Sequence, residues 1–135
     1  MVKKIMKTLL TIYTLVFTLI FSSTSFADWT EVSSNMGEQN TYYVDLERIR
    51  KVDGFVYFWT LSDYSKPLEG TLSTKIHWRG DCKLLRNKVL SFSSHKEPMG
   101  GGTGQTFPVP ESHKDWQHPP PKSSHEIILK TVCSR

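Results

Sequence analysis

A ten-residue run, FVYFWTLSDY at positions 55–64, constrains the fold of this chain more than any other segment. Alternate side chains of an extended strand point to opposite faces of a sheet. One face of this run carries Phe55, Tyr57, Trp59 and Leu61, and the other carries Val56, Phe58 and Thr60. Because both faces are rich in aromatic and β-branched side chains, the run predicts a central strand, and Asp53-Gly54 predicts the turn before it.

A second segment, 72–79, alternates cleanly and predicts a strand with one buried and one solvated face. Its two faces are Leu72, Thr74, Ile76, Trp78 and Ser73, Lys75, His77, Arg79. Gly80-Asp81 predicts a turn, and 83–93 predicts the returning strand, in which Leu84, Leu90 and Phe92 share a face with Arg86 and Lys88. With shorter strands at 29–32 and 41–44, the pattern predicts an antiparallel sheet of about five strands.

Helical signals are brief and lie at two places. Asp45 is placed to cap a short helical turn over 46–51. The spacing S-x-x-E at 123–126 predicts a terminal helix over 124–132 that turns Ile128, Leu129 and Val132 toward the sheet. The fold class is therefore α+β, an antiparallel sheet with a C-terminal helix.

The segment 96–122 between sheet and helix predicts a long loop without regular structure. It holds Gly100-Gly101-Gly102-Thr103-Gly104 and prolines at 108, 110, 119, 120 and 121. We expect Phe107 and Trp116 to dock this loop on the body of the domain.

The first 27 residues have the layout of a secretory signal peptide. A cationic start (1–7) precedes an uncharged, apolar and threonine-rich run (8–21), and small residues stand at Ser25 and Ala27. A membrane anchor is the competing interpretation, but the run is shorter than about 20 residues and lacks a positive flank after it. We predict cleavage after Ala27 and a mature domain at 28–135, periplasmic, secreted or on the cell surface. No cysteine follows the cleavage point, so no lipid or membrane anchor is expected after cleavage.

The mature part holds the two cysteines of the chain, Cys82 and Cys133. An isolated pair in an oxidising compartment predicts one disulfide. The two cysteines are 51 positions apart, which does not match the close spacing of metal ligands.

The net charge of +4, from 17 basic and 13 acidic residues, divides unevenly along the chain. Lys3, Lys4 and Lys7 belong to the signal segment, and without them 14 basic residues face 13 acidic ones. A balance of +1 does not argue for nucleic acid. Residues 46–90, however, hold nine Lys or Arg and five acids.

This local excess predicts a basic strand face as the candidate partner-binding site. Its residues are Lys75, His77, Arg79, Arg86 and Lys88. Such a face suits an acidic protein, a sulfated glycan or the phosphates of lipopolysaccharide. The alternative is a solvated strand face whose lysines discourage edge pairing.

Other chemistries find little support in the sequence. The glycines at 100–104 precede no Gly-Lys-Ser/Thr, and no nucleophile elbow is present. The histidines are His77, His95, His113, His118 and His125. Their spacing matches no ligand pattern, and we assign no metal, no cofactor and no catalytic residue. A small-molecule carrier, of haem for example, ranks third among the functions considered.

The order of short motifs resembles the surface-adhesin protein E-like domain of exported proteins from Gram-negative bacteria. The motifs are Tyr43-Val44-Asp45, Ile49 to Lys51, Val56-Tyr57-Phe58-Trp59, Tyr64 with Pro67, Gly80-Asp81-Cys82, Glu97-Pro98-Met99-Gly100, Trp116, the prolines before Ser123, and Val132-Cys133. The resemblance covers residues 29–133. It implies an antiparallel sheet, a helix near the C-terminus, paired cysteines and no catalytic residues.

Adhesins of this family bind host matrix and plasma proteins such as laminin and vitronectin and carry a lipid anchor, for which this chain lacks the cysteine. We therefore expect a non-enzymatic, adhesin-like binding domain that holds a protein or anionic surface partner on a sheet face. The second hypothesis is a soluble periplasmic accessory or inhibitor protein of the cell envelope. An exposed edge strand would also allow a homodimer.

Overall fold

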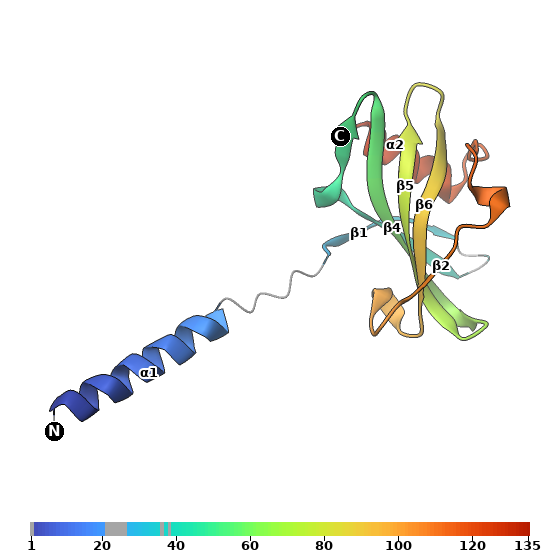
Figure 1. Ribbon diagram of the computed structural model, residues 1–135. Coiled ribbons are helices and arrows are strands. Elements are labelled where there is room, and N and C mark those ends of the chain that lie inside the picture. The colour runs from blue at the N-terminus through green and yellow to red at the C-terminus, as the bar shows by residue number, and fades with distance from the viewer. Residues whose placement is uncertain (1, 21–26, 36, 38) are drawn as a thin grey trace.

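The alternating segments form one antiparallel sheet in the computed structural model, which describes residues 2–20, 27–35, 37 and 39–135. Within these residues the sheet has seven strands: β1 (Trp29–Asn35), β2 (Asn40–Asp45), β3 (Arg50–Val52), β4 (Phe55–Leu68), β5 (Thr71–Asp81), β6 (Arg86–His95) and β7 (Gln105–Phe107). Their order is β1-β2-β4-β5-β6-β7, and β3 also pairs with β4. Helix α2 (Ser124–Cys133) packs against the sheet (Figure 1). The α+β class is confirmed, with more strands than the five expected.

The long strand β4 lies at the centre of the sheet, as its two apolar faces predicted. It pairs with β2 and β3 on one side and with β5 on the other. The turn before it is formed by Asp53 (φ 52°) and Gly54 (φ 81°), both in the left-handed region that a tight two-residue hairpin requires. The Asp-Gly signal therefore identified this turn correctly.

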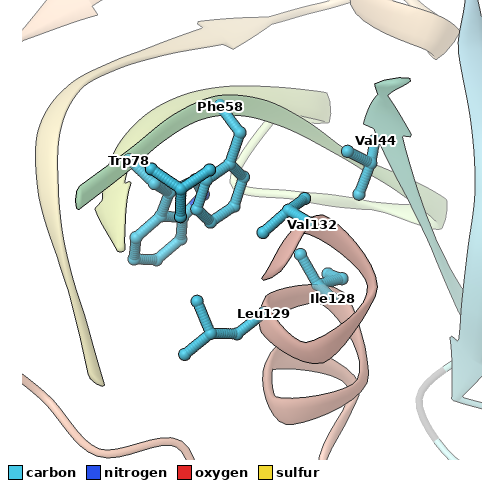
Figure 2. Close-up of a cluster of buried hydrophobic side chains, with 7 residues drawn as sticks. Val44, Phe58, Trp78, Ile128, Leu129 and Val132 are labelled. Carbon is cyan, nitrogen blue, oxygen red and sulfur yellow. The ribbon is translucent and has the colours of Figure 1, made fainter. Parts of the chain in front are cut away.

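The core lies between the sheet and α2 (Figure 2). Its buried side chains come from three strands and the helix: Val44, Val56, Phe58, Trp78, Ile128, Leu129 and Val132. The Phe58 and Trp78 rings stack at 6.4 Å between centroids, and Trp78 Nε1 donates a hydrogen bond to Thr60 Oγ1 at 2.8 Å. The three helical residues expected to face the sheet are all buried, which confirms the predicted orientation of the helix.

The ends of α2 are fixed by a cap and a disulfide. Ser123 Oγ accepts a hydrogen bond from the Glu126 backbone N–H at 3.2 Å, so the helix begins where the S-x-x-E spacing predicted. Cys133 is bonded to Cys82, with the Cα atoms 5.7 Å apart. The predicted disulfide is confirmed, and it attaches the end of the helix to the turn between β5 and β6.

That turn lies further along the chain than predicted. Gly80 and Asp81 still belong to β5, and the turn occupies Cys82 to Leu85. The Asp81 carboxylate accepts hydrogen bonds from the backbone N–H groups of Lys83 and Leu84, both at 3.1 Å, and so organises the turn itself. Gly80 has a packing role, because a Cβ there would lie 2.9 Å from Leu129 Cδ1. The glycine marks where the helix approaches the strand, not where the chain reverses.

The predicted faces of the returning strand β6 were wrong beyond Lys88. The β5–β6 register shifts so that His77 pairs with Ser91 and Trp78 with Val89, which leaves Leu90 in a bulge. A bulge adds one residue and reverses the alternation after it. Phe92 therefore pairs with Ile76 and lies on the opposite face from Arg86 and Lys88, and Leu84 lies in the turn.

The two segments assigned to turn and loop contain more structure than expected. Asp45 caps a 3-10 turn, η1 (Leu46–Arg48), as predicted, but the chain then enters β3. The segment 96–122, expected to lack regular structure, contains β7 and the 3-10 turns η2 (Pro98–Gly100) and η3 (Glu111–His113). Phe107 stacks on Phe92 at 5.8 Å, which confirms that it docks on the body. The wrong assignments share a cause, since a short strand is stabilised by its partner and has little signal of its own.

Residues 2–20 of the predicted signal segment form helix α1 (Val2–Ile20). Ser25 of the predicted cleavage motif lies outside the described residues. No helix in the described ranges combines the length and the hydropathy needed to cross a membrane.

Candidate binding site on the outer sheet face

The face of β4, β5 and β6 that points away from α2 carries the candidate residues. We call it the outer face and define it by Phe55, Tyr57, Trp59, His77, Arg79, Arg86 and Lys88, which alternate with the core positions Val56, Phe58 and Trp78. Paired residues of adjacent strands point to the same face. Tyr57 pairs with Arg79, and Arg79 pairs with Lys88. The predicted proximity of the β5 and β6 cations is thus what the register produces.

Trp116, from the proline-rich segment, completes this face. Its ring stacks on Phe55 with centroids 5.7 Å apart and an interplanar angle of 23°. The next residue, Gln117, exchanges two backbone hydrogen bonds with Asn87 of β6, at 2.9 and 2.8 Å. This bridge extends the sheet by one residue pair and holds the Trp116 ring in place. The prediction that Trp116 docks on the body is confirmed.

Arg79 lies at the centre of the aromatic cluster. Its guanidinium carbon is 4.0 Å from the centroid of Phe55, 5.9 Å from that of Tyr57 and 5.7 Å from that of Trp116. A cation over an aromatic face is stabilised by the ring quadrupole. Arg79 Nε is nevertheless buried and has no hydrogen-bond partner among the residues that the structure describes. A buried donor without a partner costs free energy, which marks this arginine as unusual.

Two further cations lie over the same tryptophan. The Arg86 guanidinium carbon is 4.6 Å and Lys88 Nζ is 5.0 Å from the Trp116 centroid. Arg86 also forms an ion pair with Asp81, Nε to Oδ2 at 3.1 Å. The backbone N–H of Leu84, followed by Arg86, lowers the pKa of the Asp81 carboxyl. Arg86 is therefore partly neutralised, whereas Arg79 and Lys88 form no ion pair within the described part of the chain.

His77 belongs to this face but not to its charge. Its ring stacks on Trp59 with centroids 4.4 Å apart and an interplanar angle of 8°. Burial, with the nearby Arg50 and Arg48, lowers the pKa of His77. A pKa below the ordinary imidazole value keeps His77 neutral at neutral pH. It contributes a ring and two polar nitrogens, not a cation.

Lys75 lies apart from the other four candidates, at the end of the face covered by η2. Its neighbour Ser73, expected on the solvated face, is fully buried. Ser73 Oγ donates to Glu97 O at 2.6 Å and accepts from the Gly100 N–H at 2.8 Å. A side chain at Gly100 would collide with the Lys75 stem, so the loop covers the strand closely. The expectation of a solvated Ser73 was wrong because a segment distant in sequence covers it.

Sequence reasoning missed the aromatic half of the site and one of its arginines. Phe55, Tyr57 and Trp59 were correctly placed on one face of the central strand, but they were not assigned to the binding site. Arg50 was assigned to a helical turn, and it pairs with Tyr57 across β3 and β4. The aromatic residues could have been found from the alternation of positions 55, 57 and 59 with that of positions 77 and 79. Neighbouring antiparallel strands place such alternating side chains side by side on one face.

The remaining histidines lie elsewhere. His113, His118 and His125 line one pocket of about 290 Å³ together with Trp78 and Val89. His95 is buried, with Nε2 2.9 Å from Ser93 Oγ and Nδ1 3.2 Å from Gly101 O. In the ranges that the structure describes, no three His, Cys, Asp or Glu residues form a group that could hold a metal ion.

Comparison with known proteins gives three findings. The family model described as surface-adhesin protein E matches residues 29–134. The fold is similar to that of Haemophilus influenzae protein E (TM-score 0.62, 15% identity, covering 83% of this chain and 88% of that one). It is also similar to protein E from non-typeable Haemophilus influenzae (TM-score 0.57, 15% identity, 83% and 79% coverage). No curated protein sequence matches this chain.

Proposed function

The chain belongs to the surface-adhesin protein E family, and on that premise we propose that it binds an anionic partner through the outer face. Membership makes it an adhesin-like protein, exported or on the cell surface. The partner class, the residues that hold it and a non-enzymatic mode of action are our proposal. The partner would be an acidic protein surface, a sulfated glycan or the phosphates of lipopolysaccharide.

The observation that carries this proposal is the environment of Arg79. The protein keeps a guanidinium at the centre of its outer face, stacked on Phe55, with a buried Nε that finds no acceptor in the described residues. A solvated strand face would need no such arrangement. Stacking holds the guanidinium without using its hydrogen-bond donors, so the cluster is preorganised for an oxyanion.

Lys88 and Trp116 extend this arrangement. The Lys88 ammonium lies over Trp116 and has no carboxylate partner in the described residues. Because opposite charges attract over several ångströms, Arg79 and Lys88, which form no ion pair with any residue that the structure describes, would accelerate encounter with a polyanion, and salt would weaken that encounter.

The experiment compares two double variants of equal charge on a heparin column and on immobilised lipopolysaccharide. Arg79→Gln with Lys88→Gln removes two charges from the cluster, and Lys51→Gln with Lys66→Gln removes two exposed charges outside it. We expect the first variant to elute at a clearly lower salt concentration, while the second stays close to the wild type. Equal elution of the two variants, with unchanged melting temperatures, would refute a specific cluster.

The export route is part of the same proposal. We propose that 1–27 is a signal peptide cleaved after Ala27 and that 28–135 is the mature domain. Intact-mass measurement of the exported protein gives the cleavage position. Surface labelling of whole cells supports adhesion, whereas release by osmotic shock alone supports the second hypothesis, a periplasmic accessory or inhibitor.

A further inference from the structure

A pocket opens on the outer face at the end where β3 pairs with β4. Its volume is about 420 Å³, within the range of small-molecule sites and too small for a folded partner. The residues of interest in its lining are Glu47, Arg48, Arg50, Tyr57, Trp59 and His77. Only His77 belongs to the basic face predicted from the sequence.

The pocket is positively charged. Arg48 and Arg50 are both exposed, so their guanidinium groups can reach a ligand. Arg48 forms an ion pair with Asp45, and its guanidinium carbon lies 5.7 Å from the Trp59 centroid. Arg50 has no carboxylate partner in the part of the chain that the structure describes. An anionic group in this pocket would therefore meet one free and one partly neutralised guanidinium.

The rest of the lining does not fit a simple anion. Glu47 is exposed at the pocket and would repel a bare sulfate or phosphate. A carboxylate accepts hydrogen bonds from hydroxyl groups, however, and neutral His77 and the Tyr57 hydroxyl can both donate and accept. Trp59 adds an apolar edge to the lining. The pocket thus offers oxyanion recognition, hydroxyl recognition and an apolar wall together.

An acidic sugar combines these three properties in one small unit. We propose that this pocket binds one acidic sugar residue, a hexuronate or a sulfated hexose, of an extended glycan. The inference rests on the proposed function, for which it names the partner class and a defined subsite.

The register of the sheet supports a chain longer than one sugar. A continuous row of paired residues crosses β3, β4, β5 and β6: Arg50 pairs with Tyr57, Tyr57 with Arg79, and Arg79 with Lys88. Three interstrand steps of about 4.8 Å make this row about 14 Å long. A glycan whose first acidic unit occupies the pocket can cross the strands and present its next acidic groups to Arg79 and Lys88.

The test is isothermal titration of the protein, purified as exported, with saccharides of defined length. A heparin-derived tetrasaccharide and tetragalacturonate distinguish a sulfated from a carboxylated glycan. Cellotetraose tests hydroxyl recognition alone, and inorganic sulfate tests oxyanion recognition alone. We expect heat from one or both acidic tetrasaccharides and none from the other two. Binding of sulfate as tight as that of the tetrasaccharides, or no binding of either tetrasaccharide, would overturn the proposal.

Two neighbouring positions of β3 provide the matched control. Arg50 and Lys51 are consecutive, so they point to opposite faces of the sheet and lose the same charge on replacement by Gln. We expect Arg50→Gln to weaken tetrasaccharide binding about tenfold and Lys51→Gln to leave it unchanged. Equal loss in the two variants would assign the effect to net charge and contradict the pocket.

A second measurement places the ligand independently of affinity. The Trp59 indole N–H signal, assigned with Trp59→Phe, should shift on adding the tetrasaccharide more than that of the buried Trp78. If no tetrasaccharide binds while Arg79→Gln with Lys88→Gln still lowers retention on heparin, the pocket is refuted and the proposed function stands. If both experiments fail, the outer face is not a site for anions.

Discussion

The two faces of the sheet present similar aromatic side chains to different surroundings. On the face covered by α2, Phe58 and Trp78 stack on each other and are closed off by Leu129, and the buried Trp78 N–H is paired with Thr60. On the outer face, Phe55 stacks against Trp116 and Arg79, and the buried Arg79 Nε has no partner in the described residues.

This difference separates stability from binding. Where a helix covers the aromatic rings, apolar contact and satisfied hydrogen bonds lower the free energy of the fold. Where cations cover them, the rings position charge at the cost of an unsatisfied donor, which a fold does not need for its own stability. The comparison predicts that the two faces respond oppositely to mutation, and four experiments test it.

The largest effect is expected from the disulfide, which attaches the end of α2 to the turn between β5 and β6. Replacing Cys82 and Cys133 by Ala releases a loop with a sequence separation of 51, so we expect unfolding free energy to fall by about 4 kcal/mol. Urea denaturation of the double variant measures it. A loss below about 1 kcal/mol would mean that the helix is held on the sheet by the core alone.

The second experiment contrasts the helix-covered face with the outer face. Leu129→Ala removes a fully buried side chain and should cost about 3 kcal/mol, while Ile127→Ala, at a 40% exposed position of the same helix, should cost less than about 1 kcal/mol. Trp116→Ala on the outer face should cost less stability than Leu129→Ala but lower heparin retention. Unchanged heparin retention of Trp116→Ala would contradict a binding role for the outer face.

The third experiment asks whether Arg79 costs stability. Arg79→Leu removes a buried donor that has no partner among the described residues, and it keeps an apolar contact with Phe55. The free energy of unfolding should therefore stay the same or rise by up to about 1 kcal/mol. Heparin retention should fall at the same time. A loss of more than about 2 kcal/mol would instead identify Arg79 as a structural residue.

The smallest effect is a pH dependence on the covered face. His125 lies with its ring 5.7 Å from Trp78 and 5.8 Å from Tyr42, and burial lowers its pKa from the ordinary 6.5. As the pH falls below 6.5, His125 therefore binds a proton in the unfolded chain before it does so in the folded chain.

The stabilising contribution of neutral His125 is thus present above pH 6.5 and is lost progressively as the pH falls below it. We expect the melting temperature of the wild type to decrease over this interval more than that of His125→Phe, with both measured by circular dichroism. Parallel pH profiles of the two proteins would exclude a role for His125.

Much of the covered face was predictable from local pattern. The alternation in 55–64 and 72–79, the Asp-Gly turn and the capping box are read within a few residues, and the structure agrees with them. The errors occurred where a non-local contact decides. Ser73 is buried by η2, the Leu90 bulge reverses the pattern of β6, and β3 exists because β4 pairs with it.

On the outer face, even more of the arrangement depends on non-local contacts that the sequence pattern does not show. The five predicted residues contain three that gather near Trp116, one neutral ring and one lysine under a loop. Sequence spacing could place Arg79 opposite the returning strand, but it could not bring Trp116 across from a position 37 residues later. Nor could it show that Arg50 lies beside Tyr57.

The sequence by itself determined the α+β class, the central strand, the face of the helix that is buried and the disulfide, because each depends on periodicity or on residue chemistry alone. The tertiary structure decided which aromatic face is covered by a helix and which by cations. That arrangement depends on where the segment 96–122 and the β3 residues pack. The segment 96–122 contacts strands that are distant in sequence, and β3 exists because β4 pairs with it, so no local pattern predicts either contact.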